Sequence, residues 1–330
     1  MVNIAINGLG RIGKQFFLAA MEQRVNWNFF INHTGDLDFI VYSLKYDSVH
    51  PSPKEKISHD GKNLIFGNKK IKVFNELEPE KLPWKKENID LVVECTGHFT
   101  EREGAEKHIK AGAKKVLISA PAKDHDVTIV YNVNNSMLKK EHKIISAGSC
   151  TTNCIALIVK IINDAFKIKS GHFVTTHAYT STQRLIDGVD KKDVRRGRAA
   201  AIDIVPSTTG AATAVVEAIP ELKGKLYGYA LRVPVVNGSF ASIFLKIDKQ
   251  TTAKEINSLF KRKASGMKGV LEYTEEQIVS ADIIHNPNSC IFDGNFTYVI
   301  DDLISVAGWY DNEWGYSNRL VGVAKLILGK

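Results

Sequence analysis

A glycine-rich turn between an apolar run and an amphipathic run constrains this chain more than any other feature of its sequence. Residues 2–7 form an apolar run typical of a buried strand, and the apolar spacing of residues 11–23 is helical. Between them, Gly8, Gly10 and Gly13 match the pattern GxGxxG. Such a turn is common by itself, but a strand before it and a helix after it predict the start of a βαβ unit.

The spacing of these glycines has a specific physical meaning in a βαβ unit. The first allows a tight turn, the second lets the backbone approach a pyrophosphate, and the third allows the helix to pack closely on the strand. The free N–H groups and the dipole of the helix then attract the anion. The pattern therefore predicts a Rossmann-type dinucleotide site, and a glycine turn without a ligand is the structural alternative.

The residue after the second predicted strand bears on the choice of dinucleotide. That strand, residues 27–32, is followed by His33, where this fold usually has an acidic residue that holds the ribose hydroxyls. A carboxylate would repel the extra phosphate of NADP, whereas a protonated histidine would attract it. The sequence leaves two readings open: either NADP is accepted, or His33 is a surface loop residue and NAD binds through other contacts.

The pattern of predicted strands and helices changes near residue 149. Before it, short apolar runs alternate with helical stretches, which predicts a parallel sheet with right-handed crossovers. After it, longer strand-like runs follow one another, which favours a mainly antiparallel sheet and an α+β domain. We expect a dinucleotide-binding domain at 1–149, a catalytic domain at 150–316 and a C-terminal helix, 317–330, that packs back on the first domain. The connection 181–204 lacks periodicity, which is typical of a functional or interface loop.

Composition excludes several classes of protein. With 44% hydrophobic and 24% charged residues, the chain is neither a disordered protein nor a fibre. No run approaches the roughly 18 apolar residues of a membrane helix, and the amino terminus does not resemble a signal peptide. The four cysteines form no CxxC pair, so neither a disulfide framework nor a zinc site is expected. A soluble, cytoplasmic protein without a metal is the expectation.

The net charge of +8 arises from 44 basic and 36 acidic residues. Most lysines lie in stretches of mixed sign, and the densest basic run, 191–198, has no interleaved aromatic residues. A solvated surface is the favoured interpretation, and a nucleic-acid footprint is the alternative. A positive field would also favour small anionic substrates.

A cysteine follows another predicted strand at the start of a helix. Ser149, Thr151 and Thr152 are capping residues, so Cys150 is expected at the helix amino terminus, where the dipole lowers a thiol pKa from about 8.5 and N–H groups stabilise an oxyanion. Its base must come from another element. His177 ends an apolar strand among hydroxyl residues, but spacing alone does not select it among ten histidines. Cys154, one turn further on, is expected to be a small buried residue.

Together these features resemble phosphorylating glyceraldehyde-3-phosphate dehydrogenases over the whole chain. The segments that carry the resemblance are NGLGRIG at 7–13, LKYDSVH at 44–50, ECTGHFT at 94–100, ISAPA at 118–122, SCTTNC at 149–154, HAYT at 177–180, RRGRAAA at 195–201, VPSTTGAA at 205–212, RVP at 232–234 and WYDNEWGYSNR at 309–319.

The resemblance implies an activity and an assembly. Cys150 would attack the aldehyde of D-glyceraldehyde 3-phosphate, and His177 would take the thiol proton and stabilise the oxyanion. Oxidation with NAD or NADP would leave a thioester, which inorganic phosphate would cleave to 1,3-bisphosphoglycerate in a reversible reaction of glycolysis or gluconeogenesis. The 181–204 loop would line a neighbouring cofactor site in a homotetramer.

The resemblance also assigns binding residues. For the substrate phosphate these are Thr180 and Arg232. For inorganic phosphate they are Ser149, Thr151, Thr209 and Gly210, with Arg196 as a contributor. For the cofactor they are Gly10, Arg11 and Ile12 at the pyrophosphate, Thr96, Gly97 and Ser119 in the cleft, and Asn312 with Tyr316 at the nicotinamide amide.

Three positions depart from the family pattern. His33 replaces an aspartate, and Val189 replaces a proline common beside the ribose. The segment 146–150 reads Ser-Ala-Gly-Ser-Cys in place of the usual Ser-Asn-Ala-Ser-Cys, so it lacks an asparagine near the catalytic turn. The first two relax the exclusion of NADP, so we expect dual or NADP-leaning specificity. The alternatives to the main activity are an erythrose-4-phosphate dehydrogenase and a secondary nucleic-acid or surface binding role.

Overall fold

The structure is a computed structural model that describes residues 2–191 and 193–329, and its chain divides into two compact units. The first unit contains residues 1–131, 135–148 and 317–330, and the second contains residues 132–134 and 149–316. The sequence places the division one residue later, between 149 and 150, and does not anticipate that residues 132–134 group with the second unit. Lys192, in the basic run at 191–198, lies outside the described residues.

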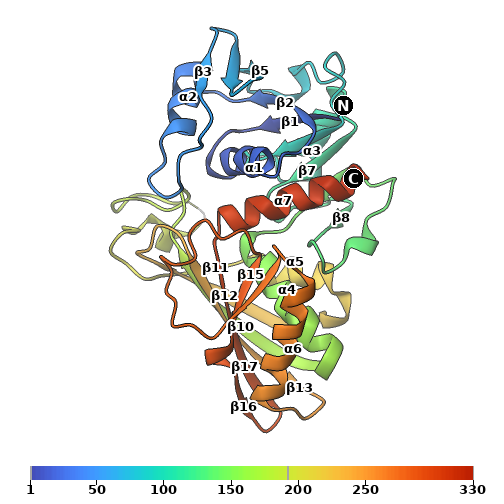
Figure 1. The fold of residues 1–330 in the computed structure, drawn as a ribbon, viewed down its shortest axis with the longest axis vertical. Helices are drawn as coiled ribbons and strands as arrows, with labels where there is room; N and C mark the ends of the chain where they lie inside the picture. Colours follow the sequence, from blue (N-terminus) through green and yellow to red (C-terminus); the bar gives the residue numbers. More distant parts are fainter. Residues whose placement is uncertain (1, 192, 330) are drawn as a thin grey trace. The chain divides into compact units, whose positions relative to one another are not determined.

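The first unit is an α/β unit built on a largely parallel sheet (Figure 1). The strands run in the order β3-β4-β5-β2-β1-β6-β7-β9-β8, and only the β3-β4-β5 edge is antiparallel. The predicted α/β class is confirmed. Its elements are β1 (Val2–Asn7), α1 (Arg11–Glu22), β2 (Trp27–Asn32), α2 (Leu37–Lys45), β3 (Ile57–His59), β4 (Asn63–Phe66), β5 (Lys69–Phe74), η1 (Pro79–Lys81), β6 (Leu91–Glu94), α3 (Arg102–Lys110), β7 (Lys115–Ile118), β8 (Val127–Thr128), η2 (Asn135–Met137) and β9 (Ile144–Ser146).

The central strands of this sheet are apolar because helices bury both of their faces. β6 (Leu-Val-Val-Glu) is buried at every position, as expected of a strand inside a parallel sheet. The core beneath it contains Trp84, Val92 and Val116, all fully buried. Register aligns Asn7 with Asn32 on one side and with Glu94 on the other, so three polar side chains meet at the carboxyl edge of the sheet.

The second unit is an α+β unit with a mainly antiparallel sheet, as the sequence predicts. The strand order is β11-β12-β10-β13-β17-β15-β14 with β16 on β17, and the pairs β10–β12 and β14–β15 are parallel. Its elements are α4 (Cys150–Phe166), β10 (Ile168–Ala178), η3 (Val194–Gly197), β11 (Val205–Thr208), α5 (Ala211–Ala218), η4 (Pro220–Leu222), β12 (Leu226–Val233), β13 (Ser239–Ile247), α6 (Ala253–Gly266), β14 (Leu271–Thr274), β15 (Cys290–Asp293), η5 (Gly294–Phe296), β16 (Tyr298–Ile300) and β17 (Leu303–Tyr310).

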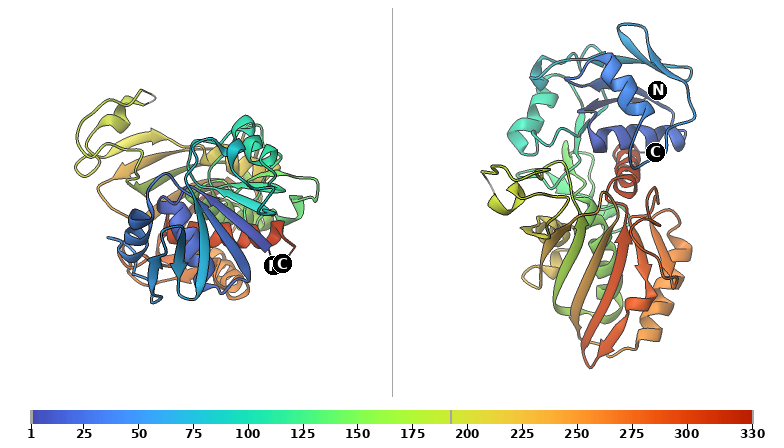
Figure 2. Two further views of the ribbon diagram at one scale, coloured as in Figure 1. Left: turned by 90° about the horizontal axis from the view of Figure 1, so that it is seen from above. Right: turned by 90° about the vertical axis from the view of Figure 1, so that its left-hand side faces the viewer.

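One face of this second sheet is covered by helix α4, and the opposite face is open. β13 alternates buried and more exposed residues, which is the pattern of a strand with one face on the core. The open face is turned toward the viewer on the right of Figure 2. Tyr227, Phe244 and Leu303 are 66%, 41% and 45% exposed. Large exposed apolar side chains on one face of a sheet are typical of an interaction surface.

The last helix, α7 (Trp314–Ile327), continues into the first unit from Ser317 on. Gln23, just after α1, donates to Asn318 at 2.7 Å and accepts from Lys325 at 2.7 Å. Gly322 lies against the ring of Tyr131, where a Cβ would approach within 3.1 Å. Among residues 2–191 and 193–329, no helix combines the length and the apolar character that a bilayer crossing needs.

Candidate active site

Cys150 is the first residue of helix α4, as the sequence predicts. The preceding Ser149 caps the helix: its hydroxyl accepts from Thr152 N at 3.1 Å, and its own N–H donates to the Thr152 hydroxyl at 3.1 Å. This reciprocal pair fixes the first turn and leaves the Cys150 thiol half-buried at the helix terminus.

The fold selects one of the ten histidines as the partner of Cys150. The Cys150 Sγ atom lies 3.4 Å from Nε2 of His177, which is within reach for proton transfer. His177 lies near the end of β10 and is 3% exposed. The parallel pairing of β10 with β12 places Arg232 directly beside His177. Spacing alone did not select this histidine. The family resemblance implied both His177 and Arg232, and the sheet register places them side by side.

The second ring nitrogen of His177 faces two groups of opposite hydrogen-bonding character. Nδ1 lies 2.7 Å from the Ala178 carbonyl, which accepts, and 2.6 Å from Nη1 of Arg232, which donates. With the proton on Nδ1, the ring bonds to Ala178 and leaves a lone pair on Nε2 facing the thiol. With the proton on Nε2, the ring bonds to Arg232 and presents a donor to the sulfur. The site therefore accommodates both proton positions that a base and an acid need.

Burial shifts the pKa values of Cys150 and His177 in the directions that favour the neutral thiol and the neutral imidazole. Burial and the charge of Arg232 lower the pKa of His177 to about 3, so the imidazole is uncharged near neutral pH. Burial also raises the pKa of the Cys150 thiol, and the charge of Arg232 and the donors of Thr151 only partly oppose it. The sequence prediction of a lowered thiol pKa is therefore wrong for the chain alone, because desolvation outweighs the helix terminus.

Replacing Arg232 with glutamine should move the alkylation of Cys150 to higher pH. The guanidinium favours the thiolate, and its loss raises the thiol pKa further, so less thiolate is present at a given pH. The measurement is the rate of iodoacetamide reaction against pH, without substrate. Arg262→Gln, an exposed position on α6, is the matched control. An unchanged or downward shift for Arg232→Gln would show that this charge does not act on the thiol.

The residues predicted to hold phosphate groups fall in two places in the second unit. The first place is beside the His177 ring, where Arg232 lies. The hydroxyl of Thr180 contacts that of Thr182 at 2.9 Å. The second place is the amino terminus of α5, where Gly210 is the cap residue and the Thr209 hydroxyl accepts from Ala211 N.

Arg196 reaches the second of these places. It donates to the Thr208 carbonyl at 3.4 Å and therefore lies beside the Thr209–Gly210 turn. Thr151, also predicted as a phosphate contact, is 4% exposed, and its hydroxyl bonds to that of Tyr310 at 2.9 Å.

Two residues that sequence reasoning missed support the catalytic pair. Tyr310 bonds to the hydroxyls of Thr151 and Thr175 and packs edge-on against the His177 ring, with centroids 5.9 Å apart. Ser239 accepts from Ala178 N and donates to Oδ1 of Asn312 at 2.9 Å. The signal for Tyr310 was its place in the WYDNE segment.

Asn312 and Tyr316 are both buried, with exposed fractions of 5% and 4%. The oxygen of Asn312 accepts from Ser239 and from Gly238 N, and these bonds orient its NH₂ group as the remaining donor.

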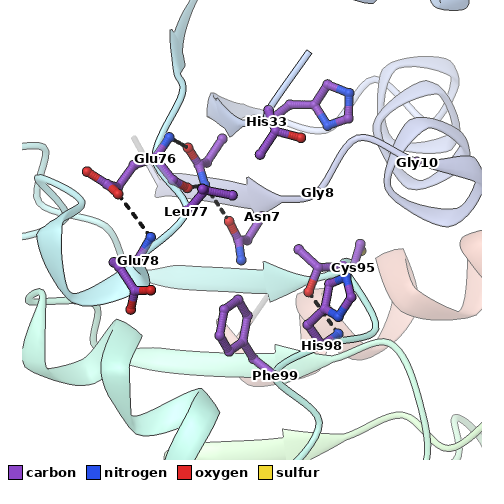
Figure 3. A pocket seen from close by; sticks show the side chains of 13 residues that line it. Asn7, Gly8, Gly10, His33, Glu76, Leu77, Glu78, Cys95, His98 and Phe99 are labelled. Carbon is purple, nitrogen blue, oxygen red and sulfur yellow. Dashed lines mark hydrogen bonds between the residues drawn. The ribbon is translucent and has the colours of Figure 1, made fainter.

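The first unit contains a cavity of about 600 Å³ above the glycine turn (Figure 3). This volume is in the range of small-molecule and cofactor sites. Of the residues predicted to bind the cofactor, Gly8, Gly10, His33 and Thr96 line it. The sequence did not single out the other lining residues, which are Asn7, Asn32, Thr34, Glu76, Leu77, Glu78, Cys95, His98 and Phe99. Asn7 and Asn32 end neighbouring parallel strands, and that position was the available signal.

The glycine turn fits a dinucleotide. A Cβ on Gly13 would lie 2.0 Å from the Gly8 carbonyl, so helix α1 approaches β1 as closely as the pattern predicts. At Gly10, the cap of α1, a Cβ would meet nothing within 4 Å, and no side chain caps the helix. Open space therefore lies at the amino terminus of α1, where the helix dipole favours a pyrophosphate.

Other residues predicted to bind the cofactor lie outside the lining of the cavity. The Arg11 side chain forms an ion pair with Asp47 at 2.7 Å. The backbone of Arg11 is therefore the part of this residue nearest the glycine turn. Ser119 N donates to the Glu94 carbonyl. Ile12, Gly97 and Ser119 do not line the cavity.

His33 is held as a neutral ring. Its Nδ1 accepts from Leu9 N at 3.3 Å, and the ring stacks on Phe39 with centroids 6.0 Å apart. Burial lowers the pKa of His33 below its ordinary value. The attraction of a phosphate by a protonated His33, one of the two readings of the sequence, is therefore not favoured. The charged side chains that line the cavity are Glu76 and Glu78.

A dinucleotide fold in one unit and a cysteine–histidine pair in the other define an NAD-dependent oxidoreductase that uses a thiol. Two family models match the chain: the NAD binding domain of glyceraldehyde 3-phosphate dehydrogenase over residues 2–102 and its C-terminal domain over residues 149–312. The chain belongs to the glyceraldehyde-3-phosphate dehydrogenase family.

Curated relatives match along the whole chain. The chain is 45% identical to glyceraldehyde-3-phosphate dehydrogenase 2 of Streptomyces avermitilis, over 99% of this chain and 98% of the relative. It is 46% identical to glyceraldehyde-3-phosphate dehydrogenase 1 of Bacillus subtilis and 47% identical to glyceraldehyde-3-phosphate dehydrogenase 2 of a Nostoc species. Both matches span 100% of this chain and 99% of the relative.

Proposed function

We propose that this enzyme carries out the phosphorylating oxidation of D-glyceraldehyde 3-phosphate to 1,3-bisphosphoglycerate, reversibly, with Cys150 as nucleophile and His177 as acid–base. The observation that carries the proposal is the 3.4 Å contact of the two side chains at a capped helix terminus, in a chain that matches the family along its length. The reaction consumes aldehyde, inorganic phosphate and oxidised cofactor, and it releases acyl phosphate, reduced cofactor and one proton.

The first steps use the thiol and the imidazole. His177 Nε2 accepts the thiol proton while the sulfur bonds to the aldehyde carbon, because a neutral thiol is a weak nucleophile. The sulfur anion and the imidazolium form together, and their attraction at 3.4 Å offsets the burial that disfavours each charge alone. The imidazolium then donates its proton to the oxygen of the thiohemiacetal, and Nε2 of His177 takes this proton back as the hydrogen and electron pair leave the carbon. When bound, the nicotinamide ring supplies the acceptor for the hydrogen and the electron pair that leave the aldehyde carbon.

The last step returns Cys150 to its starting form. A phosphate oxygen attacks the thioester carbon, the carbon–sulfur bond breaks, and the thiol recovers a proton through His177. Arg232, Thr180 and the Thr209–Gly210 turn with Arg196 supply the donors for the substrate and attacking phosphates. The thioester conserves the free energy of oxidation in a reactive acyl bond.

A coupled assay tests the reaction. Aldehyde oxidation should depend on inorganic phosphate and proceed with glyceraldehyde 3-phosphate faster than with erythrose 4-phosphate. Oxidation at the same rate without phosphate, or a preference for the four-carbon sugar, would contradict the proposal and favour the erythrose-4-phosphate alternative.

The enzyme uses NAD, and we infer that it also accepts NADP. Position 33 has no carboxylate to repel the extra phosphate, and the neutral His33 has no charge to attract it, while the carboxylates of Glu76 and Glu78 in the same cavity disfavour it. This arrangement supports dual use, with a kcat/KM for NAD less than about 100-fold above that for NADP.

His33→Asp should raise the preference for NAD by about tenfold or more, mainly through a higher KM for NADP, because the new carboxylate repels the phosphate. His33→Asn, which is uncharged, is the control. The measurement is kcat/KM with both cofactors. A wild-type preference of 100-fold or more, or equal ratios for the two variants, would contradict the inference.

We also propose a homotetramer that works in the cytoplasm. The open face of the second sheet, together with exposed apolar residues of the 181–204 loop such as Leu185, Ile186 and Val194, supports packing against further copies. A monomeric mass in solution would contradict the tetramer. A reactive thiol requires a reducing compartment, and recovery of the protein outside the cytoplasmic fraction would contradict that location.

A further inference from the structure

A buried ion-pair geometry lies beneath the cofactor cavity, and the proposed chemistry does not use it. The side chains of Glu94 and His108 are both 0% exposed, and His108 Nε2 lies 3.1 Å from Glu94 Oε2. Neither residue lines the cavity. A buried carboxylate is costly unless donors satisfy its oxygens, so the contacts around Glu94 indicate why this group is there.

One chain of hydrogen bonds reaches Glu94 from the core. The indole N–H of Trp84 donates to Nδ1 of His108 at 3.0 Å. Because an indole only donates, Nδ1 must accept, and the neutral ring carries its proton on Nε2. His108 therefore presents a donor to Glu94, and its tautomer is fixed by Trp84.

A second chain reaches the same oxygen along the edge of the sheet. The N–H of Glu76 donates to Asn32 Oδ1 at 3.0 Å, Asn32 Nδ2 donates to Asn7 Oδ1 at 2.7 Å, and Asn7 Nδ2 donates to Glu94 Oε2 at 2.6 Å. The chain starts at a backbone N–H, which only donates, so the orientation of each amide along it is fixed. Two series of donors thus converge on one oxygen of Glu94.

The other oxygen of Glu94 holds the wall of the cavity. It accepts from Thr96 N at 2.7 Å and from the Thr96 hydroxyl. Thr96 in turn lies against Gly8, where a Cβ would meet it at 2.8 Å. With Asn7 and His108, the carboxylate accepts from four donors, and an acceptor-only group is the one that fits. Asn7, Asn32, Glu76 and Thr96 all line the cavity.

We propose that Glu94 and His108 are positioning residues of the cofactor cavity, which fix the orientation of Asn7 and Thr96 through the converging hydrogen bonds from Trp84 and Glu76. The proposal rests on the proposed function, since it concerns affinity for the cofactor. The pair does not line the cavity and lies in the other unit from Cys150 and His177, so its loss should change binding and leave the thiol chemistry of the second unit intact.

Glu94→Gln is the first test. The new NH₂ group faces either the donors of Asn7 and His108 or the N–H of Thr96, none of which accepts, so Asn7 or Thr96 loses its anchor. The dissociation constants of NAD⁺ and of ADP-ribose, measured by calorimetry, should both rise by about tenfold. The rate of Cys150 alkylation without cofactor should stay at the wild-type value. Glu221→Gln, which replaces an exposed carboxylate that accepts from Asn163 in the second unit, is the matched control.

A second substitution makes the test specific to hydrogen-bond polarity. In Trp84→Phe/Glu94→Gln, the His108 proton is free to move to Nδ1, and Nε2 then accepts from the new amide. The double variant should therefore bind both ligands at least about threefold more tightly than Glu94→Gln does, even though Trp84→Phe alone disturbs the core. Additive or greater loss would overturn the polarity argument, and wild-type affinity in Glu94→Gln would overturn the positioning role.

If Glu94→Gln does not fold, a pair of substitutions at His108 tests the same claim. Glutamine is able to accept from Trp84 and donate to Glu94, whereas leucine does neither, so His108→Gln should bind both ligands more tightly than His108→Leu. Equal affinities would refute the proposal. If the wild type binds neither NAD⁺ nor ADP-ribose, the proposed function itself fails, and the positioning role fails with it.

Discussion

Cys150→Ser is expected to lower kcat by about 10⁴-fold or more, the largest effect of any single substitution in this enzyme. The serine hydroxyl would occupy nearly the same volume beside His177 but is far less acidic than a thiol, and an oxygen ester would conserve less of the free energy of oxidation. Steady-state oxidation of glyceraldehyde 3-phosphate with phosphate present measures the effect.

The control for this substitution is Cys290→Ser. Cys290 is fully buried in β15, so its replacement should cost stability but keep the reaction. The thermal midpoint of each variant separates the two effects. A Cys150→Ser enzyme that turns over within tenfold of the wild type would exclude the thioester route.

His177→Asn is expected to lower kcat by about 10²- to 10⁴-fold at neutral pH. The amide offers no base at the position of Nε2, so the thiol, whose pKa burial raises, must lose its proton to solvent. The dissociation constant of NAD⁺ should change little, because the cofactor cavity lies in the other unit.

The pH dependence separates a base from a purely structural residue at position 177. In the variant, thiolate forms only as the pH approaches the raised thiol pKa, so the deficit relative to the wild type should shrink as the pH increases. A constant deficit from about pH 6 to 10 would argue against proton transfer to His177. The matched control, His142→Asn, changes a histidine outside the site and should leave the whole profile unchanged.

Much of the fold was predictable because it depends on neighbours along the chain. The run Val2–Asn7, the glycine turn and the helix from Arg11 have the bounds that periodicity and turn chemistry predict, apart from one residue at the helix end. The capped start of α4 follows from Ser149 and its neighbours in the same way. Short-range geometry of this kind requires no knowledge of the rest of the molecule.

Parts of the site were not predictable from any local pattern. Arg232 lies 55 residues from His177 in sequence, and only the register of β10 against β12 brings their side chains to 2.6 Å. Tyr310 comes from the last strand, 159 residues after its partner Thr151. Asn7, Asn32 and Glu94 form one hydrogen-bonded row because three separate strands end at the same edge.

The sequence by itself determined the class of fold, the helix terminus under Cys150 and the glycine turn, since these arise from residues close together in the chain. Only the tertiary structure decided which histidine meets the thiol, that His33 is held neutral, and that the Cys150 pKa is raised rather than lowered. The reason is that solvent exclusion and side-chain pairing are properties of the packed chain, and desolvation competes with the local field of a helix only once the fold has formed.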